Sequence, residues 1–530
     1  MVTALAVRHE ELLEYRHDSN ARRAWLQRNG EHPFMSCPAC GQWGRYGLCE
    51  WCDFDATDYV AVAAVHAHRN ARVARDDIPD SDGRAPLVHC RACGQLTRPP
   101  ICTWCDHELP ATIYEDAPAL TGLQLQRSKA YALARGMVRL DVVEQLRLIA
   151  YLLRWIALGA AVGVLAGLSS AGFLQTLTWA TNLRLEHGWM LFVLPLGGLV
   201  VGLAYHHFGG RSGEGNSLII DEIHDPSGWV PRRMAPLVFG GTVITHLFGG
   251  SAGREGTAIQ MSGSLTDGFS RLIRLGPDDR RLMLIAALGG GFGAVFGVPI
   301  AGCVFALEVQ AVGRMRYDAL IPALSASLIG DLVVRATGVK HALLPQLVEV
   351  HVTVGLAGKV AIAGLAFGLA SIVFSELVHG IKRALATIVS WPPARPLVGG
   401  IGVIGLTYLV GTRDYLGLSI PLITKATAGG AGIVAGAFAL KLLFTAITLG
   451  AGFQGGEVTP LFVIGATLGV TMGRLLGVPI PLMAAIGFVA VFAGATNTPL
   501  ACTVMGVELF GGSGVVLFAI GCVVSYIFSS

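Results

Sequence analysis

The amino-acid sequence predicts an all-α polytopic membrane protein with a separate, cysteine-rich N-terminal part. Three observations predict it: the composition, an abrupt change of composition near residue 140, and two different internal repeats. Of the 530 residues, 53% are hydrophobic and only 14% are charged, whereas soluble domains carry roughly 25% charged residues. The composition therefore excludes an ordinary soluble fold.

Five long runs contain no Asp, Glu, Lys or Arg. Each run can supply at least part of a membrane-spanning helix, which needs about 20 apolar residues. Together they predict a bundle of several helices in lipid. The runs are 155–183, 189–205, 234–253, 396–412 and 475–507.

Charge and motifs exclude two classes of function. The net charge is +3 and the basic residues are scattered, so we expect no nucleic-acid partner. The sequence has no H-E-x-x-H, P-loop or G-x-S-x-G signature, so we expect no enzyme.

The N-terminus is expected to lie in the cytoplasm. The residues from Met1 to Glu11 contain no apolar run that could act as a signal peptide. Basic residues also gather on the N-terminal side of the first span, the side that the positive-inside rule assigns to the cytoplasm. They are Arg127, Lys129, Arg135, Arg139, Arg147 and Arg154.

Eight cysteines form two sets with the same spacing, C-x2-C-x8-C-x2-C, offset by 53 residues. Two C-x2-C turns aim four thiolates at one point, which predicts a closed, structural zinc site in each set. Disulfides are disfavoured in the cytoplasm, and iron in a similar four-sulfur site is the stronger alternative. The predicted ligands are Cys37, Cys40, Cys49 and Cys52, then Cys90, Cys93, Cys102 and Cys105.

These patterns divide the chain into six parts. A polar, helical segment, the two zinc ribbons with the linker between them, and a cytosolic linker precede the transmembrane domain, which has two inverted halves at about 141–340 and 350–530. The ribbons can bind a partner, which the sequence does not identify. The boundaries are 1–35, 36–54, 55–88, 89–107, 108–140 and 141–530.

The second repeat lies in the membrane part. The segment Gly253-Arg254-Glu255-Gly256-Thr257 recurs 202 residues later as Gly455-Gly456-Glu457-Val458-Thr459, and the segment from Pro299 to Glu308 recurs 200 residues later. Repeated, interrupted segments are typical of transporters that bind substrate where broken helices meet near the midplane.

Each glycine-rich segment is expected to begin a half-helix inside the membrane. The free amides and the positive end of the helix dipole attract an anion without a buried cation. Glu255 and Glu457 lie in apolar surroundings, where an acid is a functional candidate by default. The alternative for Glu255 is an exposed loop position beside Arg254.

Residues 140–530 resemble the CLC family of anion channels and proton-coupled anion antiporters. The resemblance is carried by GREG at 253–256, GVPIAGCVFALE at 297–308 and GGEVTP at 455–460. It implies an all-α CLC-type inverted-repeat bundle with broken helices, in a homodimer whose subunits each have a pore. It also implies that Glu255 resembles the family's gating, proton-carrying glutamate.

Departures from the chloride-type pattern resemble the fluoride/proton antiporters of this family. The usual serine motif is replaced around Gly213–Ser217, GREGP reads GREGT, and Val458 replaces an aromatic residue. Fluoride is small and strongly hydrated, so its site needs hard hydrogen-bond donors, which Asn216 and Thr459 supply. The implied anion-binding residues are Asn216, Gly253, Arg254, Gly256, Thr257, Gly456, Val458 and Thr459.

Three points stay open at this stage. Either Glu214 or Asn216 occupies the place of the family serine; we favour the amide, because a second carboxylate repels an anion, and Asn216 can also be a helix N-cap. Glu308 is followed by Val309, so the usual internal proton acceptor is absent. Tyr526 is only a weak substitute for the family's central tyrosine.

The leading hypothesis is a fluoride/proton antiporter that exports cytosolic fluoride across the bacterial inner membrane. A chloride/proton exchanger or chloride channel of the same fold is the alternative, although no other chloride ligand replaces the lost serine. A third hypothesis makes the membrane part a sensor or scaffold, with the zinc ribbons as the working end.

Overall fold

The structure, a computed structural model, describes residues 34–36, 43–45, 88–89, 96–97 and 142–530, except 227, 311–314, 342–343, 348–349 and 530. Contacts divide the chain into two compact units, Met1–Val142 and Val143–Ser530. The predicted zinc ligands and most of the predicted segments before residue 141 lie outside the described residues. Their zinc chemistry therefore stays a prediction.

Two short hairpins accompany the cysteine repeat. Strand β1 (Phe34–Ser36) pairs antiparallel with β2 (Trp43–Arg45), and β3 (Val88–His89) pairs antiparallel with β4 (Leu96–Thr97). Met35 faces Gly44 in the first hairpin, and Val88 faces Thr97 in the second. Both residues of the second pair lie 53 positions after those of the first, so the 53-residue repeat extends from the cysteine spacing to the backbone register.

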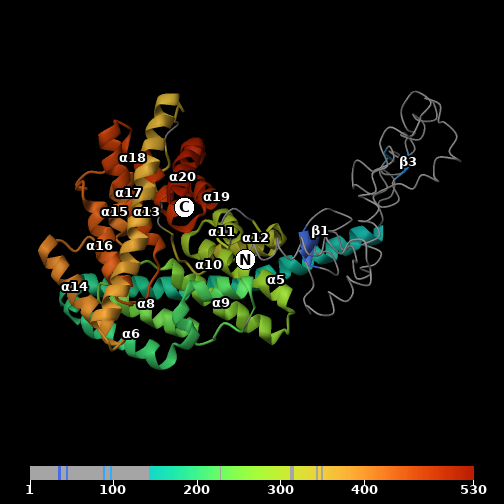
Figure 1. The fold of residues 1–530 in the computed structure, drawn as a ribbon, viewed down its shortest axis with the longest axis horizontal. Coiled ribbons are helices and arrows are strands. Elements are labelled where there is room, and N and C mark those ends of the chain that lie inside the picture. Colours follow the sequence, from blue (N-terminus) through green and yellow to red (C-terminus); the bar gives the residue numbers. More distant parts are fainter. Residues whose placement is uncertain are drawn as a thin grey trace, which may run out of the picture. The chain divides into compact units, whose positions relative to one another are not determined.

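The second unit is a bundle of helices (Figure 1), and the helices of its two halves follow the same order along the chain. Helices of the second half resemble their equivalents in length: α8 and α16 each have 14 residues, and α9 and α17 have 18 and 19. The first half contains α5 (Val142–Glu186), α6 (Leu194–Phe208), α7 (Asn216–His224), α8 (Met234–Leu247), α9 (Glu255–Leu272), α10 (Pro277–Phe296), α11 (Pro299–Glu308) and α12 (Leu320–Ala336). The second contains α13 (Val354–Ile388), α14 (Ala394–Val410), α15 (Ile420–Thr427), α16 (Ala437–Gly450), α17 (Val458–Leu476), α18 (Ile480–Thr496), α19 (Pro499–Phe510) and α20 (Val515–Ser529).

The prediction of a polytopic helical membrane protein is confirmed. Among the described residues, six helical segments are long and apolar enough to cross a membrane. Others are shorter than the ~20 residues that a crossing requires. Helices α8 and α16, for example, end just before the two glycine-rich segments, so the predicted interrupted helices are also present.

The turn before each Pro-containing repeat segment has the same backbone form in both halves. Gly297 caps the C-terminus of α10 and Asn497 caps that of α18, both with left-handed φ values, 73° and 57°. Glycine and asparagine are the residues that tolerate this conformation at a helix end. Pro299 and Pro499 then begin the next helices, where a missing amide hydrogen costs nothing.

Two glutamates hold the two halves together by reciprocal capping. The carboxylate of Glu308, at the end of α11, accepts hydrogen bonds from the amides of Leu500 and Ala501 at 3.0 and 2.8 Å. Glu508, at the end of α19, does the same for the first amides of α11, at 3.0 and 2.7 Å. A carboxylate is favourable there because it faces free N–H groups and the positive end of the helix dipole.

Aromatic side chains also pack where the two halves meet. The rings of Phe292 on α10 and Phe492 on α18 stack with centroids 6.0 Å apart and an angle of 11° between the planes. These residues are equivalent under the 200-residue offset, so the pseudo-symmetry axis passes between them.

We predict that Glu508→Ala lowers the free energy of unfolding by about 2 kcal/mol, because two charge-assisted hydrogen bonds are lost and two amides of α11 lose their partner. Thermal unfolding in detergent measures the change. The control is Glu376→Ala, since Glu376 is exposed and only loosely paired with Arg383 at 3.7 Å. Equal unfolding midpoints for the two variants would contradict the capping role.

Candidate functional site

The two repeated glycine-rich segments meet at their helix tips. Helix α9 begins at Glu255 and α17 at Val458. The segments before them form an antiparallel bridge, in which the Gly253 amide donates to the Gly456 carbonyl at 2.6 Å and the Gly456 amide donates to the Gly253 carbonyl at 2.8 Å. The predicted meeting of the two half-helices is therefore present.

Glycine is required at this crossing because there is no space for a side chain. A Cβ atom on Gly456 would lie 2.8 Å from the Gly256 amide nitrogen and 3.0 Å from that of Glu255. A Cβ on Gly253 would lie 2.9 Å from the Gly456 carbonyl oxygen. Real side chains essentially never show contacts under 3.0 Å, so any larger residue would push the two tips apart.

Glu255 crosses from its own helix to the tip of the other. Its side chain is completely buried, which excludes the exposed-loop alternative. One carboxylate oxygen accepts hydrogen bonds from the amides of Thr459 at 3.1 Å and Arg254 at 3.0 Å. The other accepts a hydrogen bond from the Thr459 hydroxyl. The carboxylate thus occupies the position at the α17 tip that suits an anion.

Arg254 lies beside this carboxylate without binding it closely. Its Nε atom is 3.6 Å from the Glu255 Oε1 atom, which gives charge attraction but exceeds hydrogen-bonding distance. Within the described part of the chain, this buried Nε has no hydrogen-bond partner. Protonation of Glu255 would remove the negative charge that both the guanidinium and the helix tip attract.

The remaining predicted residues on the two helices line the same region. The Thr257 hydroxyl is buried and lies 2.7 Å from the Thr242 hydroxyl on α8. Val458 and Thr459 are both buried in the first turn of α17. Gly256 follows Glu255, and a Cβ built on it would lie 3.2 Å from the Asn216 Nδ2 atom.

That contact brings Asn216 to the crossing. The N-cap of α7 is Gly215, with φ 66° and no side-chain cap, and Asn216 is the first helical residue. The interpretation of Asn216 as an N-cap is therefore wrong, because the chain turns through a conformation that favours glycine. The amide is free to face Gly256, whereas Glu214 is exposed one residue before the turn.

The two repeated glutamates have different surroundings. Glu255 is buried, but the side chain of Glu457 is exposed ahead of α17. Tyr526 lies near the end of α20, which packs against α13 and α18. Of the two acids, only Glu255 lies between the tips.

Sequence reasoning missed Lys441. This lysine on α16 is completely buried, and its ammonium donates to the hydroxyls of Ser251 and Ser419, both at 2.9 Å. It also donates to the carbonyls of Tyr415 at 3.2 Å and Gly417 at 2.7 Å. A lone lysine in an apolar helix was the available signal, because a buried lysine must find several oxygen partners.

Lys441 belongs to one face of α16 that holds the loop leading into α9. Lys441, Thr445 and Thr448 follow helical spacing, so their side chains share a face. Ser251 on the loop lies 3.0 Å from the Thr445 hydroxyl, and its amide donates to the Thr448 hydroxyl at 3.1 Å. The second half therefore positions the segment that carries Glu255.

Gln260 is a second residue that sequence reasoning missed. It lies on α9 and is nearly buried, and within the described part its Oε1 atom has no hydrogen-bond partner. A Cβ built on Gly215 would lie 3.6 Å from its Nε2 atom. An amide therefore lies beside the turn that presents Asn216.

We predict that Lys441→Met lowers the free energy of unfolding by about 2 kcal/mol. The two serine hydroxyls keep other partners, but the carbonyls of Tyr415 and Gly417 lose a charged donor inside the protein. Thermal unfolding in detergent measures the loss, with Lys425→Met as the control because Lys425 is exposed. A variant more stable than the native chain would mean that burying the ammonium costs more than its hydrogen bonds contribute.

The chain is similar in sequence to known anion channels and exchangers. The chain is 46% identical over 394 residues to a chloride/fluoride channel protein of Pseudomonas syringae pv. tomato, covering 73% of this chain and 86% of that protein. It is 26% identical over 392 residues to an H(+)/Cl(-) exchange transporter of Vibrio vulnificus, covering 66% and 81%.

Solved structures show the same fold. A CLC-type fluoride/proton antiporter matches with a TM-score of 0.69 and 33% identity, over 71% of this chain and 95% of the other. A cyanobacterial Cl-/H+ antiporter matches with a TM-score of 0.62 and 18% identity, over 71% and 94%. The model of the voltage gated chloride channel family matches residues 197–530. The chain therefore belongs to this family, the CLC family.

Proposed function

We propose that this protein is a proton-coupled fluoride antiporter that exports cytosolic fluoride across the bacterial inner membrane. The observation that carries the proposal is the buried Glu255 carboxylate, which binds the amide and the hydroxyl of Thr459 at the tip of α17. This titratable group stands where an anion would bind. The names of the Pseudomonas relative and of the fluoride/proton antiporter structure support the choice of fluoride.

The Glu255 carboxylate and the anion compete for the α17 tip, and this competition couples anion movement to proton movement. A charged Glu255 holds the tip and excludes the anion. A protonated Glu255 carries no charge for the tip amides to attract, so the side chain leaves and an anion replaces it. Return of the carboxylate then expels the anion and releases the proton, so each exchange requires a titratable group at this position.

The donors around the crossing fit fluoride. Fluoride gives up its strong hydration only to short, hard donors, and the Asn216 amide and the Thr459 hydroxyl are donors of this kind. The glycines at positions 253, 256 and 456 let the backbone approach closely, while Arg254 and Thr257 complete the surroundings. Val458 offers only a buried apolar side chain. A chloride/proton exchanger remains the second candidate, favoured by the Vibrio relative.

We also propose a homodimer in the inner membrane, with the N-terminal domain in the cytoplasm. The resemblance to the family implies the dimer. A face for it is available where α11 packs against α12 and α19. Its exposed apolar side chains include Ile300 and Leu500, which are 53% and 52% exposed.

The proposal predicts that purified protein in liposomes moves fluoride much faster than chloride, and that fluoride flux carries protons in the opposite direction. Ion-selective electrodes and a pH electrode measure both. The proposal fails if chloride moves as readily as fluoride, or if fluoride moves without protons.

Glu255→Gln provides the matched variant for this experiment. An amide does not titrate, so we expect proton coupling to be abolished, whereas Glu457→Gln is expected to keep it because the carboxylate bound at the α17 tip is that of Glu255. Proton antiport retained in Glu255→Gln and lost in Glu457→Gln would transfer the role to the second carboxylate.

The cysteine repeat is proposed to hold two structural zinc ions, one in each four-cysteine set. The identical register of the two hairpins supports two equivalent folded units. A closed four-sulfur site keeps no open coordination position, so the role of the ribbons is structural or regulatory rather than part of anion transfer.

Cys37→Ser is predicted to remove one of the two zinc ions and leave fluoride flux unchanged, because three remaining thiolates no longer close the site. Metal analysis and liposome flux test this together. Cys303→Ser is the control, since Cys303 is buried on α11. Deleting residues 1–120 is likewise expected to preserve flux, because the transporter does not need the ribbons, whereas a scaffold would lose its role with them.

A further inference from the structure

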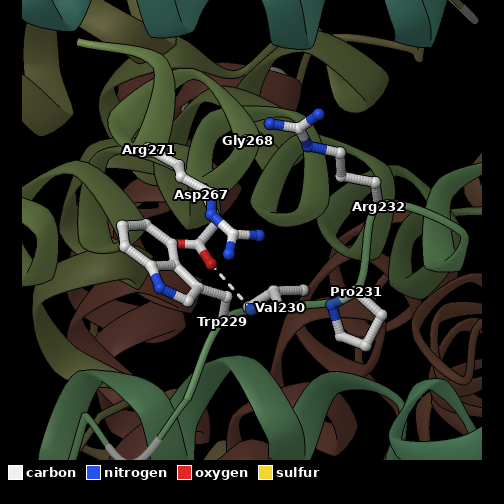
Figure 2. A pocket seen from close by; sticks show the side chains of 7 residues that line it. All are labelled: Trp229, Val230, Pro231, Arg232, Asp267, Gly268 and Arg271. Carbon is white, nitrogen blue, oxygen red and sulfur yellow. Dashed lines mark hydrogen bonds between the residues drawn. The ribbon is translucent and has the colours of Figure 1, made fainter. Parts of the chain in front are cut away.

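A pocket of about 240 Å³ lies apart from the tip crossing, between the α7–α8 segment and the last turns of α9 (Figure 2). Trp229 and Arg232 line it from the connecting segment, and Asp267 and Arg271 line it from α9. It therefore combines one aromatic ring, two arginines and one acid.

The acid is already neutralised inside the protein. Both oxygens of Asp267 are occupied, by the Arg280 guanidinium at 2.5 and 3.0 Å and by the Val230 amide at 2.7 Å. Arg280 also binds Glu222, which Arg211 contacts at 2.8 Å. Two buried carboxylates are thus balanced by two guanidinium groups, and this network contributes no net negative charge to the pocket.

The two pocket arginines provide the remaining charge. In the described part of the chain, neither Arg232 nor Arg271 takes part in an ion pair, and both side chains are exposed. The Arg271 guanidinium lies over the Trp229 ring, 5.2 Å from its centroid, and Arg280 lies 4.6 Å from the same ring. Stacking restricts the rotamers of Arg271, so less entropy is lost when it binds an anion.

Glycine keeps the other side of the pocket open. A Cβ built on Gly268 would lie 3.5 Å from the Arg232 Nε atom, so a longer side chain would compete for the space beside the guanidinium. Figure 2 shows Arg232 and Arg271 on different sides of Gly268. Both arginines line the same pocket, so a group with several oxygens has a charged donor on each side of it.

The pocket lies at the end of the bundle where α5 begins. The Arg154 guanidinium, in the early part of α5, binds the carboxylate of Asp279, the residue before Arg280 on α10. On α9, Leu265 and Leu272 are seven residues apart and 38% and 75% exposed, so they share an apolar outer face beside the pocket. Trp229 is 36% exposed, as is typical of tryptophan at a membrane boundary.

We propose that this pocket binds the phosphate group of an anionic phospholipid. Two guanidinium groups match the geometry and charge of a phosphate diester. The leucines of α9 offer apolar contact to the acyl chains, which favours a lipid over free phosphate. A zwitterionic headgroup binds less well, because its ammonium lies close to the same arginines.

Native mass spectrometry of the full chain in detergent, with added dioleoyl phosphatidylglycerol or dioleoyl phosphatidylcholine, tests the proposal. We expect phosphatidylglycerol to be retained preferentially. In Arg232→Gln/Arg271→Gln its affinity is expected to fall roughly tenfold or more, because two charged donors are removed. Lys382→Gln/Arg383→Gln removes two exposed charges from α13 and is expected to retain the lipid.

The outcomes separate the possible ligands. Equal retention of both lipids, or the same loss in both double variants, would overturn the proposal, because it would show nonspecific attraction. Displacement of the lipid by millimolar inorganic phosphate would assign the pocket to free phosphate instead and also overturn it. The pocket variants are expected to keep the unfolding midpoint of the native chain, since both arginines are exposed and form no ion pair in the described structure.

Discussion

The rest of the structure depends on the direct contact of two helix tips through the backbone. Free amides at a buried helix end are costly unless they find partners. The Gly253–Gly456 bridge pairs two of them, and the Glu255 carboxylate accepts from the Thr459 amide. Two positive helix ends would otherwise repel one another, so a negative group between them is required for stability. The same requirement creates a place that an anion can occupy.

Polar contacts between the halves keep this arrangement in position. Lys441 and its neighbours on α16 hold the loop before α9. Glu308 caps the first turn of α19, and Glu508 caps the first turn of α11. Each contact gives a hydrogen-bond partner to polar groups that cannot bond to water inside the bilayer. The proposed release and rebinding of the Glu255 carboxylate requires such a rigid frame, because small displacements would break its hydrogen bonds at the α17 tip.

The repeat is symmetric in backbone but not in chemistry. Both halves place a glutamate before or at the start of a half-helix, yet Glu255 is buried and Glu457 is exposed. The proposed mechanism needs one titratable group, and a second carboxylate between the tips would repel both the first and the anion. Glu457, the equivalent of Glu255 in the second half, therefore only precedes α17 and does not lie between the tips.

The sequence by itself determined the membrane class, the two repeats and the region of the site, because hydrophobic runs and repeated motifs reflect local requirements of lipid and helix ends. It also singled out Glu255, Thr459 and Asn216. Only the tertiary structure decided that Gly215 rather than Asn216 caps α7, that Glu255 and Glu457 differ in exposure, and that Lys441 supports the loop. The contacts of Glu255 with Thr459 and of Lys441 with Ser251 join residues 204 and 190 positions apart, and a single sequence does not show which distant residues meet.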